Sequence, residues 1–218
     1  MSELLDNSRH RIESLKRIIK TLHDGADPAS VKEEFGELLS EVGASEIAAM
    51  ENSLMAEGMA QAEIQRMCDV HAAVLGGAAP HAATEVPPGH PVHTFKLENE
   101  RIREIAAEYR EAFQQLSESK NGRDVVSWRQ AHEQLGALEV HYQRKEYLVF
   151  PFLEKAGIAG PPKVMWGVHD EIREKVAAAG ELLEAAPGLD ADGLALAAET
   201  VVAPMLDQVL GMTDKEDR

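Results

Sequence analysis

The chain has 218 residues, which is enough for one domain or for two small ones that each bury a core. Its formal net charge of −16 argues against nucleic acid or an anionic membrane as a partner, because both are bound through basic surfaces. The single cysteine excludes an intramolecular disulfide and a cysteine-rich zinc or iron–sulfur site. The charged N-terminus has no apolar signal core, and no long uninterrupted apolar run follows it, so we expect a cytoplasmic protein.

The composition favours an all-α fold. Ala, Leu, Glu and Met are abundant and β-branched runs are few, and these are residues that lose little entropy in a helix. Four short helices are expected in residues 1–76. They cover residues 3–23, a segment from DPAS to about Gly43, a segment capped by Ser45, and the segment EIQRMCDVHAAVL.

Residues 77–89 are predicted to be a linker, because this stretch is rich in Gly, Ala and Pro and has no periodicity. Residues 90–218 then form the second domain, in which four longer helices are expected. Their ranges are about 91–119, 124–156, 161–185 and 191–211. Short connections between four such helices predict an up-down-up-down four-helix bundle behind the small helical N-terminal domain.

Histidine and glutamate recur in a pattern on these helices. His93, His141 and His169 each fall on a different helix, and each has a glutamate five residues later, at Glu98, Glu146 and Glu174. The fourth helix has Glu199, which precedes a proline by five residues, as Glu146 does. Carboxylate and imidazole side chains from several helices are how metal sites are built in bundle cores, and this ligand set suits iron, manganese or zinc.

On the second helix, His141 and Glu146 each share a helical face with apolar residues. At about 100° per residue, His141 aligns with Leu138, Leu148 and Phe152, and Glu146 aligns with Leu135, Tyr142, Phe150 and Leu153. Residues five apart diverge by roughly 140° on an α-helix, however. The two side chains can therefore meet only through a π-bulge near Arg144 or with Glu146 approaching from the far side.

Other readings of individual residues stay open. His90 could cap its helix instead of binding a metal, and Glu174 suits a solvated face. Cys68 and His71 lie on one helical face and could form a second metal or redox site, although a buried thiol beside a core histidine accounts for them more simply.

Residues 90–210 resemble a hemerythrin-like (HHE cation-binding) domain through HPVHTFKLEN, HYQRKEYLVFPFLEKAG, PPKVMWGVHDEIRE and ETVVAPML. The first 76 residues, with EIAAMENSLMAEG and EIQRMCDVHAAVL, resemble the DUF438 domain that precedes such domains. The resemblance implies a non-haem iron centre, usually di-iron, held by His141 and His169, by Glu199, and by His93 or His90.

The chain departs from the usual His-x3-Glu pattern of this family at two positions. Lys145 occupies the fourth residue after His141, so the ligand role passes to Glu146, and Ala195 stands where the fourth helix would carry a histidine. His90 together with His93, or Glu98, would complete the ligand set, or the site holds one metal.

Three functions follow from these observations. The first is an iron-binding protein that senses or binds oxygen or nitric oxide, with the N-terminal helices passing the signal to a protein partner. The second is a di-iron redox enzyme or an iron donor in iron–sulfur cluster repair. The third is a helical interaction module with a degenerate metal site.

Overall fold

The computed structural model describes residues 2–23, 38, 44–60, 86–118 and 125–217. The second and fourth expected N-terminal helices, the predicted linker up to residue 85, Cys68 and His71 lie outside the described residues. The chain forms two compact units, residues 1–80 with 146–167 and residues 81–145 with 168–218. Every regular element in the described segments is a helix, which confirms the all-α prediction.

The first unit contains helices α1 (Ser2–His23) and α3 (Ala44–Ala56), both close to their predicted ranges. They pack through an apolar seam, and the buried residues are Leu15, Ile18 and Ile19 of α1 with Met50 and Leu54 of α3. Nζ of Lys16 also donates a 2.7 Å hydrogen bond to Glu57, just beyond α3. This unit includes α8 (Phe150–Lys155) and the first residues of α9 (Gly160–Ala185) as well.

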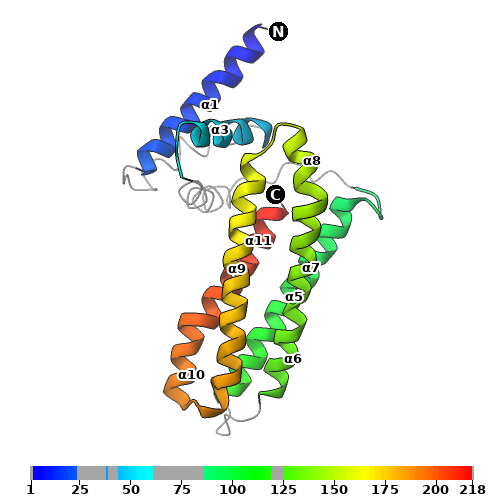
Figure 1. Cartoon of the computed structure of the whole chain (residues 1–218), viewed down its shortest axis with the longest axis vertical. Coiled ribbons are helices and arrows are strands. Elements are labelled where there is room, and N and C mark those ends of the chain that lie inside the picture. Colours follow the sequence, from blue (N-terminus) through cyan, green and yellow to red (C-terminus); the bar gives the residue numbers. More distant parts are fainter. Residues whose placement is uncertain (1, 24–37, 39–43, 61–85, 119–124, 218) are drawn as a thin grey trace. The chain divides into compact units, whose positions relative to one another are not determined.

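The second unit is the bundle, in which the chain runs up and down four times (Figure 1). Its first helix is α5 (Pro91–Glu118), and the second begins as α6 (Val126–Leu135) and continues as α7 (Ala137–Arg144). The third is the remainder of α9, followed by a short 3₁₀ turn at Ala186–Gly188. The core residues are mostly large and apolar, among them Ile102, Ile105, Tyr109, Phe113, Trp128, Ile172, Leu183, Leu206 and Val209.

The fourth helical run consists of α10 (Ala191–Ala197), η3 (Ala198–Val202) and α11 (Ala203–Glu216). It begins where the carboxylate of Asp190 accepts a 2.9 Å hydrogen bond from the backbone N–H of Gly193, which caps the helix. The whole run is long and apolar enough to cross a membrane by length and composition. In the structure this run packs against α5.

Two π-helical turns interrupt the bundle helices. One is η1 (Lys145–Val149), which follows α7 directly, and the other is η3. Each has a glutamate as its second residue and is followed two residues later by a proline, at Pro151 and Pro204. Proline cannot donate an intrahelical hydrogen bond and crowds the preceding turn, so a widened turn just before it is physically consistent. Of the two alternatives for the spacing of His141 and Glu146, the π-bulge near Arg144 is therefore present.

The π-turn corrects the predicted stripes on the second helix. Leu148 and Phe152, expected on the same buried stripe as His141, are 62% and 69% exposed. Phe150, expected in line with Glu146, is buried. The constant step of 100° per residue fails here, because a π-turn adds a residue per turn and shifts the phase of the following residues.

Candidate metal centre

Each of the four helical runs of the bundle contributes one ionisable side chain to a buried cluster. Glu98 comes from α5, His141 from α7, His169 from α9 and Glu216 from the last turn of α11. Lys145, the first residue of η1, completes what we call the His–Glu cluster. All five residues belong to the second compact unit.

His141 lies at the centre of the cluster and is 2% exposed. Its Nδ1 is 2.7 Å from Oε2 of Glu98, and its Nε2 is 2.9 Å from Oε2 of Glu216. A neutral imidazole can donate through only one nitrogen, so both hydrogen bonds to ionised carboxylates form together only when the ring carries both protons. The His141 ring forms a T-shaped contact with the Phe95 ring, with the ring centroids 5.6 Å apart.

Glu216 is the carboxylate on which the cluster converges, and its side chain is 1% exposed. In addition to His141, Nζ of Lys145 lies 2.7 Å from Oε2, and Nε2 of His169 lies 3.8 Å from Oε1. Burial alone raises the pKa of the Glu216 carboxyl. The contacts with His141 and His169 and the charge of Lys145 outweigh burial, and they hold this pKa well below its usual range.

His169 is held by an aromatic stack. Its ring, which is fully buried, lies parallel to Tyr142 with the centroids 3.9 Å apart and the planes 9° apart. The guanidinium of Arg173 lies 5.8 Å from the centroid of the Tyr142 ring and donates a 2.8 Å hydrogen bond to Glu139. That hydrogen bond is the main cause of a lowered pKa at Glu139. The position of the His169 ring is therefore set by packing as well as by charge.

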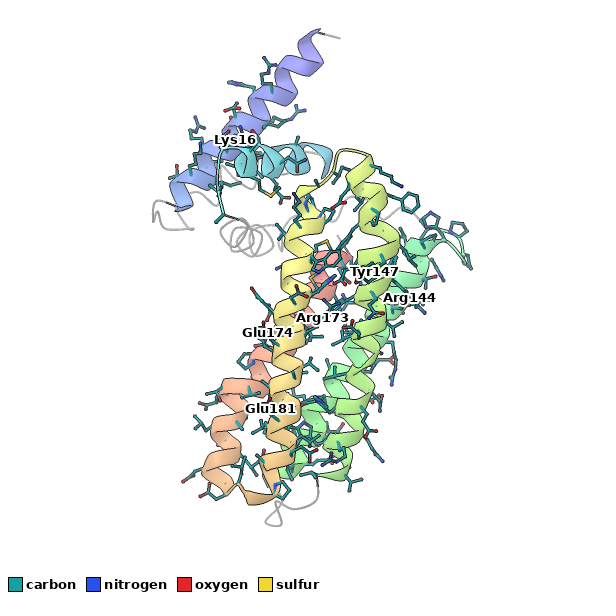
Figure 2. All side chains as sticks on the ribbon, viewed as in Figure 1. Lys16, Arg144, Tyr147, Arg173, Glu174 and Glu181 are labelled. Atoms are coloured by element: carbon teal, nitrogen blue, oxygen red, sulfur yellow. The ribbon has the colours of Figure 1, made fainter. Side chains whose placement is uncertain are left out.

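Two cations flank the carboxylates at this level of the bundle. Arg144, which is labelled in Figure 2, has a side chain that is 47% exposed. It forms an ion pair with Oε1 of Glu98. Lys145, in contrast, is 7% exposed, and its Nζ lies 5.2 Å from the centroid of the Phe95 ring. Burial lowers the pKa of Lys145, and the negative charge of Glu216 opposes that shift without cancelling it.

The structure brings together only part of the ligand set expected from the sequence. His141, His169 and Glu98 are in the cluster, whereas Glu199 is exposed on η3. His90 is exposed, and its Nδ1 accepts a 3.2 Å hydrogen bond from the backbone N–H of Val92, so it caps α5 as in the alternative reading.

The two remaining candidate ligands are His93 and Glu146, and both are at least partly buried. His93 is half-buried on the first turn of α5. Glu146 is 3% exposed on η1 and belongs to the other compact unit, so its burial is established but not a role in the cluster.

Sequence reasoning missed Glu216 and the burial of Lys145. The fourth helix was expected to end near Gly211, which placed Glu216 outside it, but α11 continues to Glu216. Hydrogen bonds from α5 hold this extension, since Asn99 and Arg103 donate to Asp217 at 2.9 and 2.7 Å. The sequence did contain a signal for Lys145. It lies four residues after His141, on a face of the helix that is otherwise buried.

The donor chemistry of the cluster fits one metal ion. Two imidazole Nε2 atoms, of His141 and His169, face the two oxygens of Glu216, and two histidines with one carboxylate are a ligand set of non-haem iron. Glu98 bonds the opposite nitrogen of His141, as carboxylates that orient a metal-binding histidine do. The described part of the chain shows no three His, Cys, Asp or Glu side chains already arranged around a common ion. An ion would have to replace the hydrogen bond between His141 and Glu216.

Comparison with known proteins agrees with the two-part organisation. Residues 15–80 match the model of a family of unknown function, DUF438, and residues 90–218 match the hemerythrin HHE cation binding domain. No curated protein and no solved structure matches the chain. The second match covers more than half of the 218 residues, and it includes every residue of the His–Glu cluster. The chain belongs to the hemerythrin HHE cation-binding family and carries a DUF438 domain ahead of its helical bundle.

Proposed function

We propose that the bundle binds one non-haem iron ion through His141, His169 and Glu216, and that it senses or binds a small diatomic ligand, oxygen or nitric oxide. The observation that supports this proposal is the approach of both histidine Nε2 atoms to one buried carboxylate, at 2.9 and 3.8 Å. The three residues come from three different helices, so only the folded bundle assembles them.

The surrounding residues orient these three side chains. Glu98 holds Nδ1 of His141, which directs Nε2 of the same ring toward Glu216. The Tyr142 stack fixes the ring plane of His169. Iron held by three side chains would supply further coordination positions for a diatomic ligand. Burial of the cluster keeps bulk water from competing for them.

The proposal is tested by the metal content and the absorption spectrum of protein purified without oxygen. We expect close to one iron per chain and a spectral change when nitric oxide or oxygen is added. His141→Ala and His169→Ala should each abolish both signals. His90→Ala is the matched control, because this histidine was also a predicted ligand but is exposed, and it should leave iron content unchanged. Equal iron content in all four proteins would contradict the proposal.

A second candidate is a helical interaction module whose polar cluster needs no metal. The ion pair between Lys145 and Glu216 and the hydrogen bonds on both sides of His141 favour this reading, because they neutralise the cluster internally. Iron-free protein, with no thermal stabilisation by added ferrous ion, would support it. A redox enzyme or an iron donor is distinguished instead by turnover with a reductase or by iron transfer to a cluster scaffold.

A further inference from the structure

Lys145 places a positive charge where the cluster would hold a metal ion. Its Nζ lies 2.7 Å from Oε2 of Glu216, and the same oxygen is 2.9 Å from Nε2 of His141. The ammonium and His141, a proposed ligand, therefore contact the same carboxylate oxygen. An ammonium donates hydrogen bonds and has no lone pair, so it cannot itself ligate a metal.

The surroundings keep this charge in place. The side chain of Lys145 is 9% exposed, its ammonium lies over the Phe95 ring at 5.2 Å, and the carboxylate it pairs with is 1% exposed. Charges in such an environment are poorly screened by salt, unlike that of Arg144, which is 47% exposed. Neutralising Lys145 would remove the ammonium from Oε2 of Glu216, so removal of the charge has a direct consequence for what Glu216 binds.

We infer that Lys145 is a resident cation that competes with a divalent metal for Glu216 and thereby sets how weakly the cluster binds that metal. The inference rests on the proposed function for the identity of the ligands. A metal that binds Glu216 must displace or share the ammonium on Oε2, and the two positive charges repel each other at short range. Lys145 is thus a determinant of affinity and not a ligand.

Two neutral substitutions and one charge-preserving substitution separate charge from packing. Lys145→Met keeps the length of the stem and removes the charge, and Lys145→Gln removes the charge but can still donate a hydrogen bond to Glu216. Both should tighten ferrous-ion binding by at least tenfold. Lys145→Arg keeps the charge, because a guanidinium stays protonated at every working pH, and should remain within about threefold of the wild type.

The experiment is an anaerobic titration of the full chain with ferrous ion against a chromogenic chelator, with unfolding of the metal-free proteins followed in parallel. The metal-free Met and Gln variants should melt below the wild type, and ferrous ion should raise their melting temperatures more than it raises that of the wild type. Both readouts are independent of any reaction of the loaded protein.

The outcomes distinguish this inference from the proposed function. If the wild type binds one ion and the neutral variants bind it no more tightly, the inference is wrong and the proposed function stands. If only the neutral variants bind ferrous ion, Lys145 competes as inferred and the wild type is not an iron protein. If none of the proteins binds ferrous ion, both ideas fail.

Discussion

Glu216→Gln should lower the free energy of unfolding of the metal-free protein by about 3–5 kcal/mol, because it removes the hydrogen-bonded counter-charge of the buried Lys145 ammonium. The two side chains are 9% and 1% exposed and lie 2.7 Å apart. At that separation, with an effective dielectric constant of about 20, their gross attraction is about 6 kcal/mol. Glutamine can still accept a hydrogen bond, which returns about 1 kcal/mol of the loss.

The assay is chemical unfolding of the full chain in excess chelator, followed by intrinsic tryptophan fluorescence, to which the buried Trp128 of the same bundle contributes. Asp207→Asn is the matched control, since it neutralises a carboxylate on the same helix that is 75% exposed and 3.9 Å from Arg110. That change should cost less than about 1 kcal/mol, as exposed ion pairs do.

A double-mutant cycle identifies the pair responsible. Combining Glu216→Gln with Lys145→Met should destabilise the protein by about 1–3 kcal/mol less than the sum of the two single changes, because no lone buried charge then remains from this pair. Strictly additive effects, or a loss for Glu216→Gln as small as that of the Asp207 control, would refute the reasoning that this ion pair is buried and coupled.

Three further predictions concern other parts of the molecule. Glu98→Gln should weaken ferrous-ion binding 10–100-fold in a chelator titration, as loss of an orienting carboxylate does, whereas the exposed Glu100→Gln should not change it. Trp128→Ala should cost about 3–5 kcal/mol in denaturant unfolding, because the indole is fully buried. The hydrogen bond from Lys16, with that from Lys20, lowers the pKa of Glu57 to about 2 from 4.5, so the stability it adds is present above pH 4.5 and is lost as the pH falls toward 2. A carboxyl NMR titration checks this, and an unchanged Glu57 pKa in Lys16→Met would contradict it.

Much of the fold was predictable because it depends on local patterns. Apolar residues at helical spacing indicated the four bundle helices. A π-turn after Arg144 was one of the two alternatives that the five-residue spacing of His141 and Glu146 left open, and the structure has it. Both family resemblances rested on local sequence blocks and are confirmed.

The carboxylate expected on the fourth helix lies apart from the cluster in the structure. Glu199 was assigned from a short resemblance, but its side chain is exposed on η3. The glutamate of this helical run that contacts His141 is Glu216, which lies 17 positions later in the chain. Nothing in the pattern near Gly211 indicates that the helix continues, because a glycine followed by polar residues is a common helix end. The partner of Lys145 was not predictable from the local sequence either. Lysine is rarely buried without a partner, and the partner here comes from a distant helix.

The sequence by itself determined the helical class, the two-part organisation and the two histidines of the cluster, because each is encoded in short-range periodicity or in a contiguous motif. Only the tertiary structure decided which charges meet those histidines. The hydrogen bonds of Asn99 and Arg103 to Asp217 join the end of α11 to α5, and this extension carries Glu216 to both His141 and Lys145. Burial makes such pairings energetically decisive, and burial is a property of the packed helices that no single segment carries.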